Sequence, residues 1–199
     1  MDASEVLRTK QAVVAAAHRA FHGGLQRNVG GNLSARIPAA EACVIKATGM
    51  GFAECAVENL SVVGLDGQVL EGGPPTSDVA IHLAIYQRRP DVHGIAHAHT
   101  PWATGWAAAG LAPPPVTVTA HAKLGPVPLI PLAPGGGTQT DAEIIAAMGD
   151  GRLKAAILEQ HGALACGRSI LEAIHLLELI EENAHIAAVR AVVLALPTQ

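Results

Sequence analysis

The alternation of apolar and polar positions predicts long helices at both ends of the chain and short strands between them. Capping-box pairs, an Asp or Ser three residues before a Glu, open a helix over residues 2–21 and another over residues 169–193. Shorter helices are predicted over 76–89, from 101 past 106 and over 140–148, and strands at 30–37, 43–47, 61–65, 68–70, 93–99, 116–119, 127–130, 154–159 and 163–166. Asp66-Gly67 is typical of a tight hairpin. We find no internal repeat or linker, which favours a single α/β domain over residues 1–199.

The composition is that of a folded domain without a nucleic-acid-binding surface. The chain has 199 residues, of which 50% are hydrophobic and 15% charged, so it can bury a core and disorder is not expected. Its net charge is −4, and Lys and Arg are scattered. Two tryptophans, one tyrosine and two phenylalanines offer few stacking platforms for bases. We therefore expect no nucleic-acid partner.

The cysteines and the N-terminus indicate a cytoplasmic protein. Cys43, Cys55 and Cys166 are far apart and form no C-x-x-C pair, which is typical of reduced thiols. The first residues are too charged for a signal peptide. No apolar run approaches the roughly 18 residues that would span a membrane, so no membrane association is expected.

Two histidines separated by one residue are the strongest chemical feature. On a strand, His97 and His99 face the same side, about 7 Å apart along the chain. A catalytic zinc needs three protein ligands and an open position, and His161, after the apolar strand 155–158, could supply the third. The alternative is a chance spacing in a chain with ten histidines, and spacing alone leaves both interpretations open.

An ordered set of motifs resembles the class II aldolase/adducin family. Along the chain these are Gly30 to Ser34, Thr48-Gly49, Pro75-Thr76-Ser77-Asp78 with His82, His97-Ala98-His99-Thr100 and Gln160-His161-Gly162. No single motif is specific, but their order is, and the resemblance covers nearly the whole chain.

The resemblance implies a fold, a metal and a set of site residues. The fold would be a three-layer α/β/α sandwich around a mostly antiparallel sheet, assembled as a homotetramer with active sites at subunit interfaces. Zn²⁺, or another divalent cation such as Mn²⁺ or Co²⁺, would be held by His97, His99 and His161. The phosphate of a small phosphorylated sugar would bind at Gly31, Asn32, Thr48, Gly49, Thr76 and Ser77. Asp78 would be the acid/base carboxylate.

The residue types at these positions suit that chemistry. A cation chelating a carbonyl and its neighbouring hydroxyl stabilises an enediolate as a Lewis acid, and a carboxylate can move the protons. Ser77 stands where a helix begins, and helix N-termini attract phosphate. The alternative interpretation is that Ser77 and Asp78 only cap the helix and that the glycines are ordinary turn residues. His82, one turn after Asp78, is interpreted as a packed histidine or as a partner of the site.

Three departures from the family pattern leave the reaction open. Asp78 stands where the aldolases usually carry Glu, and Asp is typical of the epimerases. Residues 119–123 lack the second Asp of the epimerases. The aldolase tyrosines are missing, since Leu132 occupies one position and Tyr86 is the only tyrosine. Our first hypothesis is a zinc-dependent aldolase-type lyase that cleaves a C–C bond of a small phosphorylated ketose.

Two alternatives use the same cleavage chemistry. They are a ribulose-5-phosphate 4-epimerase and a decarboxylase of a phosphorylated 3-oxo acid. A non-enzymatic, adducin-like binding domain is disfavoured, because such domains lack the three ligand histidines that this chain retains.

Overall fold

The computed structural model of the chain describes residues 1–133 and 137–197, and within these ranges eight strands form one sheet. The strands are β1 (Asn32–Arg36), β2 (Ala42–Lys46), β3 (Leu60–Gly64), β4 (Val69–Glu71), β5 (Gly94–Ala98), β6 (Leu129–Ile130), β7 (Ala155–Leu158) and β8 (Gly162–Gly167). They lie in the order β4-β3-β2-β1-β5-β8-β7-β6, and neighbours are antiparallel except β6 and β7. The predicted, mostly antiparallel sheet is confirmed.

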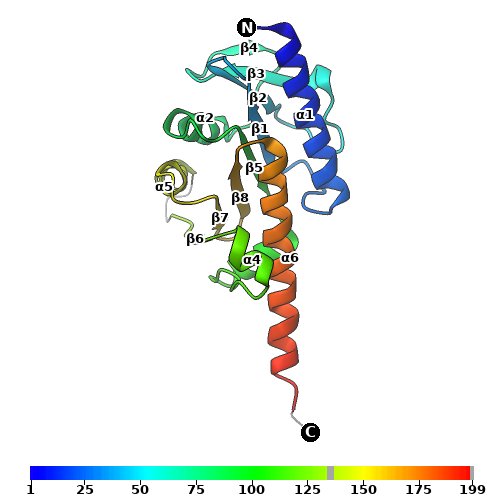
Figure 1. Cartoon of the computed structure of the whole chain (residues 1–199), viewed down its shortest axis with the longest axis vertical. Coiled ribbons are helices and arrows are strands. Elements are labelled where there is room, and N and C mark those ends of the chain that lie inside the picture. The colour runs from blue at the N-terminus through cyan, green and yellow to red at the C-terminus, as the bar shows by residue number, and fades with distance from the viewer. Residues whose placement is uncertain (134–136, 198–199) are drawn as a thin grey trace.

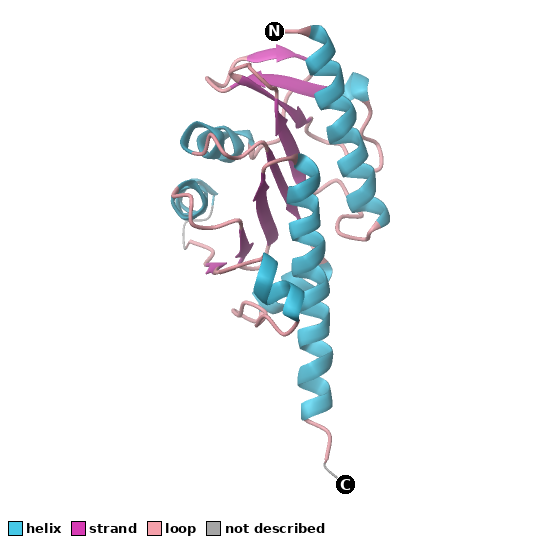
Figure 2. Ribbon diagram, viewed as in Figure 1, coloured by secondary structure: helices cyan, strands magenta, loops and turns pink. Residues whose placement is uncertain are grey.

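Helices cover both faces of this sheet (Figures 1 and 2). One face carries α1 (Ala3–His22), α3 (Pro101–Ala108), α4 (Val118–Lys123) and α6 (Ile170–Leu194), and the other carries α2 (Val79–Arg88) and α5 (Gly137–Gly149); the short η1 (Val57–Asn59) precedes β3. Because side chains alternate along a strand, Val44 packs under α1 and α6 while Ile45 packs under α2 and α5. The predicted three-layer α/β/α fold is confirmed.

Local sequence signals account for where several elements begin. The Asp2 carboxylate accepts the Ser4 amide at the start of α1, and the Ser169 hydroxyl accepts the Glu172 amide at the start of α6. Gly67, with φ of +92°, supplies the left-handed backbone of the turn between β3 and β4. These three features were predicted from residue spacing alone.

The strand predicted over residues 116–119 is wrong. Thr117 is instead the N-cap of α4, where its side chain accepts the Ala120 amide. The amide of Val116, which a strand would have used for pairing, donates to the side chain of Asn183 in α6. The alternating Val and Thr residues therefore start a helix, because local capping and a side chain of α6 use the groups that strand pairing would need.

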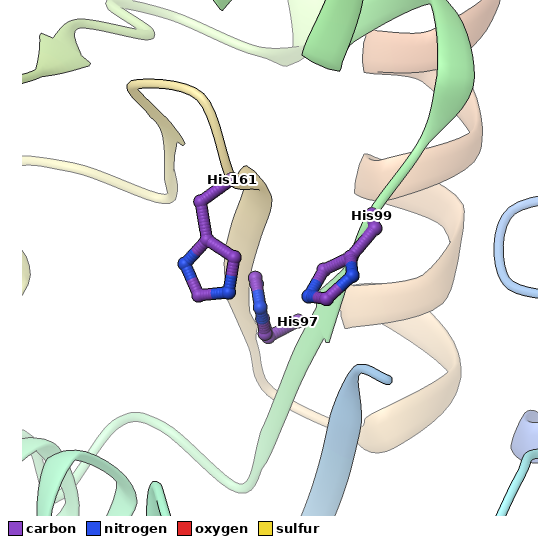
Figure 3. A group of neighbouring side chains, drawn as sticks. All are labelled: His97, His99 and His161. Carbon is purple, nitrogen blue, oxygen red and sulfur yellow. The ribbon is translucent and has the colours of Figure 1, made fainter. Parts of the chain in front are cut away.

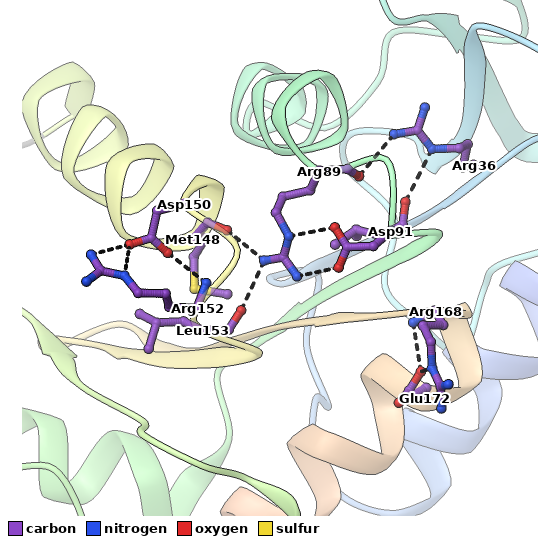
Figure 4. Close-up of polar contacts among 10 residues, drawn as sticks. Arg36, Arg89, Asp91, Met148, Asp150, Arg152, Leu153, Arg168 and Glu172 are labelled. Carbon is purple, nitrogen blue, oxygen red and sulfur yellow. Dashed lines mark hydrogen bonds and ion pairs between the residues drawn. The ribbon is translucent and has the colours of Figure 1, made fainter.

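Arg89, just after α2, joins α2 to α5 and to the sheet (Figure 4). Its guanidinium pairs with Asp91 and donates to the carbonyls of Met148, at the end of α5, and Leu153, just before β7. Arg36 of β1 donates to the carbonyl of Arg89. These contacts of the buried Arg89 side chain hold α2 and α5 side by side over one face of the sheet.

The three cysteines are free and buried. Burial raises the pKa of the Cys43 and Cys166 thiols to about 12 and that of Cys55 to about 11, so none is a reactive thiolate at neutral pH.

None of the helices in the described ranges combines the length and apolarity that crossing a membrane requires.

Candidate active site

Three histidines converge at the place where β5 ends and β8 begins (Figure 3). His97 lies in β5, His99 directly follows β5, and His161 lies in the turn between β7 and β8. A ring nitrogen from each lies within 4.8 Å of the others. The convergence follows from strand pairing, because β5 and β8 are antiparallel neighbours with Ala98 opposite Ala163. The structure thus brings together the three histidines predicted to bind a metal.

The hydrogen bonding of His97 fits a metal ligand. Its Nδ1 lies 3.0 Å from the carbonyl oxygen of Ala163 and must donate to it, which leaves Nε2 as the atom with a lone pair. That Nε2 is buried and has no hydrogen-bond partner among the described residues. A buried nitrogen without a partner is costly unless a cation occupies the space before it.

The protonation of the cluster also fits a metal site. Burial, followed by repulsion from His161 and His99, lowers the pKa of His97 to about 3. Burial likewise lowers the pKa of His99. Both rings are therefore neutral at pH 7, as metal coordination requires. Three imidazole ligands can hold a divalent cation and leave a coordination position open.

Close backbone approach explains the glycines beside the cluster. A Cβ on Gly30 would lie 2.7 Å from Cε1 of His99, and a Cβ on Gly31 would lie 2.8 Å from the carbonyl oxygen of His97. Gly31 also has φ of +67°. A Cβ on Gly162 would lie 2.4 Å from the carbonyl oxygen of Ala98. These glycines are required by packing against the histidine-bearing strand, whatever their part in phosphate binding.

Gln26 supports the cluster and was not predicted. Its Oε1 accepts the backbone amide of His99 at 2.7 Å, and its Nε2 donates to Asn28 Oδ1. The same Asn28 oxygen accepts the amide of Gly30. A lone Gln in a loop gives no sequence signal for such a role.

Asp78 is the N-cap residue of α2, yet its side chain does not cap the helix. It accepts hydrogen bonds from Asn32 Nδ2 at 2.7 Å and from Ser77 Oγ at 3.0 Å. The alternative that the side chains of Ser77 and Asp78 serve as helix caps is therefore wrong. Burial would raise the pKa of Asp78, but these hydrogen bonds and nearby histidines outweigh it and lower the pKa below its usual value. Asp78 is ionised at neutral pH.

The segments predicted to bind phosphate lie side by side. The Thr48 amide donates to the Pro74 carbonyl, and the Thr76 amide donates to the Lys46 carbonyl, each at 3.0 Å. Thr48, Gly49 and Ser77 are exposed, whereas Thr76 and Asn32 are buried.

Lys46 links this region to the glycine loop and was also missed. Its ammonium, on a buried side chain, donates to the carbonyl of Val29, just before Gly30, and to that of Met50, just after Gly49. Burial lowers the pKa of Lys46. The available signal was a lysine at the end of an otherwise apolar strand, β2.

A cavity of about 390 Å³ opens beside the histidines. Asp78, His97 and His161 line it, together with Asp141 from α5 and with Leu132. Burial, followed by the negative charge of Asp78, raises the pKa of Asp141. The helix predicted over residues 140–148 begins earlier, at Gly137, so Asp141 lies inside α5 and lines the cavity.

The three histidines could hold a metal ion, and the carboxylates of Asp78 and Asp141 line the cavity beside them. The model of the family described as class II aldolase and adducin N-terminal domain matches residues 11–188. The chain belongs to this class II aldolase/adducin family, and the predicted resemblance is confirmed.

Individual relatives include both epimerases and aldolases. The L-ribulose-5-phosphate 4-epimerase UlaF of Salmonella paratyphi C is 35% identical over 176 residues, which are 82% of this chain and 77% of that protein. A solved L-fuculose 1-phosphate aldolase is 29% identical, with a TM-score of 0.84 over 96% of this chain and 89% of that one. The L-fuculose-1-phosphate aldolase of Thermus thermophilus is 25% identical, with a TM-score of 0.82 over 96% of this chain and 99% of that one.

Proposed function

We propose that this protein is a metal-dependent sugar-phosphate 4-epimerase acting on a ketopentose phosphate such as L-ribulose 5-phosphate. The observation that carries the proposal is the pair of carboxylates, Asp78 and Asp141, that line one cavity beside the histidine triad. The likeness to UlaF supports it. The epimerase, our alternative hypothesis from sequence, thereby replaces the lyase as the preferred function.

Epimerisation by cleavage requires two groups that handle protons. When the C3–C4 bond breaks, its electrons stay on C3 and the C4 hydroxyl proton must leave. When the aldehyde turns over and the bond forms again, the new C4 oxygen must receive a proton on the other face. Asp78, being ionised, accepts the first proton, and Asp141, which lines the same cavity, is the group placed to return a proton in the second step. Exchange with water resets both carboxyl groups.

The metal in this proposal is Zn²⁺, with Mn²⁺ or Co²⁺ as other candidates. His97 Nε2, His99 and His161 would hold it, in keeping with the neutral rings of His97 and His99 and with the buried His97 nitrogen that has no partner among the described residues. When bound, the cation supplies a Lewis acid that stabilises negative charge next to the substrate carbonyl. Metal analysis should find about one zinc per chain, and His99→Ala should lose most of it.

The substrate phosphate is assigned to the junction of three segments. Thr48 and Gly49 expose a turn beside Thr76 and Ser77, and the N-terminal end of α2 adds its positive dipole. Lys46 lies buried beneath the junction. Gly31 and Asn32 complete the set, although the Asn32 amide is already shared between Asp78 and His82.

We also propose that the protein is a cytoplasmic homotetramer with active sites near subunit contacts. The second half of α6 runs beyond the body of the subunit (Figure 1). It exposes the apolar side chains of Ile186, Val189, Val192, Val193 and Leu194. A helix end that is apolar and lies away from its own core favours contact with another subunit. The buried free thiols suit a reducing compartment.

An aldolase-type lyase is the second candidate. The likeness to L-fuculose 1-phosphate aldolase favours it, and the same cleavage step would simply end with release of the aldehyde. One experiment separates the two. Zinc-loaded protein is incubated with L-ribulose 5-phosphate and with L-fuculose 1-phosphate, and the products are resolved by NMR. Conversion of the first to its C4 epimer supports our proposal, whereas dihydroxyacetone phosphate formed only from the second would favour the lyase.

A further inference from the structure

A continuous chain of hydrogen bonds runs from the core to Asp78. Tyr86 OH lies 2.8 Å from Ser34 Oγ, which lies 2.7 Å from His82 Nδ1. His82 Nε2 lies 2.6 Å from Asn32 Oδ1, and Asn32 Nδ2 lies 2.7 Å from Asp78 Oδ2. The chain forms because its members share faces: three are spaced four apart along α2, and two are alternate residues of β1.

Only one arrangement of protons satisfies every bond in this chain. The ionised carboxylate of Asp78 can only accept, so the Asn32 amide nitrogen faces it and the Asn32 oxygen faces His82. His82 must then carry its proton on Nε2. Its bare Nδ1 must accept from Ser34, and Ser34 in turn accepts from Tyr86. Burial keeps His82 neutral by lowering its pKa to about 4.

We propose that His82 is a positioning residue, whose neutral Nε2–H tautomer holds the Asn32 amide in the orientation that donates to Asp78, while Ser34 donates to its bare Nδ1. With the other tautomer, Asn32 would turn its carbonyl oxygen toward the carboxylate and repel it. The Asp78 carboxylate would then lose its fixed orientation at the cavity. The inference rests on the proposed function only where it assigns proton transfer to Asp78.

The tautomer is tested directly by NMR of full-length, zinc-loaded protein with ¹⁵N-labelled histidine at pH 7. His82, identified by the signals lost in His82→Gln, should show a protonated Nε2 and an unprotonated Nδ1. Asp78→Asn removes the carboxylate that can only accept, so the Asn32 amide is free to turn, and this variant should show a mixture of the two tautomers. A wild-type His82 protonated on Nδ1, or an unchanged spectrum in Asp78→Asn, would overturn the inference. This measurement needs no substrate.

The positioning role is tested by a matched pair of substitutions assayed on L-ribulose 5-phosphate. His82→Gln keeps an N–H near the Nε2 position, whereas His82→Asn reaches only the Nδ1 position and cannot meet Asn32. We expect His82→Asn to lower kcat about 10- to 100-fold with little change in KM, and His82→Gln to recover most of the loss. Equal losses in both variants, or a change in KM alone, would contradict a positioning role.

Two controls separate this inference from folding defects and from the proposed function. Thr9 lies in α1, on the face of the sheet opposite α2, and its hydroxyl donates to the carbonyl of Glu5. Thr9→Val removes this hydroxyl and should leave kcat unchanged. If His82→Asn does not fold, the wild-type and Asp78→Asn spectra decide the matter. If the wild-type protein does not convert L-ribulose 5-phosphate, the proposed function fails, and the NMR result alone accepts or rejects the His82 tautomer.

Discussion

The stability of this protein should respond to mild acid through His82. In the folded state the ring is buried and its pKa is lowered to about 4, while the charge of Asp78 acts weakly in the opposite direction. In the unfolded chain its pKa returns to about 6.5. Since the unfolded state takes up the proton first, falling pH favours unfolding. The contribution of His82 to the free energy of unfolding is fully present above about pH 6.5 and is lost as the pH falls toward 4.

The two pKa values set the size of this effect. At pH 5 the unfolded histidine is almost fully protonated, whereas about one folded molecule in ten carries the proton. The difference corresponds to a loss of about 2 kcal/mol in the free energy of unfolding, relative to a residue that does not titrate.

His82→Gln supplies the residue that does not titrate. At pH 7 it should be less stable than wild type by roughly 1–3 kcal/mol, because Ser34 loses its acceptor. Between pH 7 and pH 5 that gap should narrow by about 2 kcal/mol. Urea unfolding of the metal-free proteins, at one protein concentration, measures both values. The contributions of His97 and His99 cancel because wild type and His82→Gln both retain these residues. Thr9→Val should keep the wild-type pH dependence. Parallel curves for wild type and His82→Gln would refute the reasoning.

Three further changes test the site and the assembly. Asp78→Asn should lower kcat by about 10²–10⁴-fold while zinc content stays normal, and a variant that keeps full turnover would show that another group takes the proton. Gly30→Ala places a methyl group against the His99 ring and should weaken zinc binding about 10-fold or more in a chelator competition. Gly105→Ala, where an added Cβ meets nothing within 4 Å, is its control, and equal affinities would contradict the packing argument. Val193→Glu places a charge on the exposed end of α6 and should reduce the mass of the assembly measured by light scattering, and an unchanged mass would show that this surface lies outside the subunit contacts.

Local features of this protein could be predicted from the sequence because they depend on neighbouring residues. The caps at Asp2 and Ser169 and the turn at Gly67 each rest on contacts within a few positions. The two histidines of His97-Ala98-His99 share a face for the same reason. The strand predicted over residues 116–119 was wrong, because a distant residue, Asn183, uses the amide that pairing would have needed.

The assembly of the site was decided by tertiary structure. Asp141 reaches the cavity because Arg89 holds α5 beside α2, and nothing near Asp141 in the sequence records that contact. Asn32 and His82 are 50 positions apart, and they meet because β1 and α2 pack on each other with matching faces. Residue spacing along the chain fixes which side chains share a face, but packing of the sheet against its helices fixes which faces meet. The sequence alone therefore determined the candidate metal ligands, and only the folded chain determined the hydrogen bonds that hold Asp78 in place.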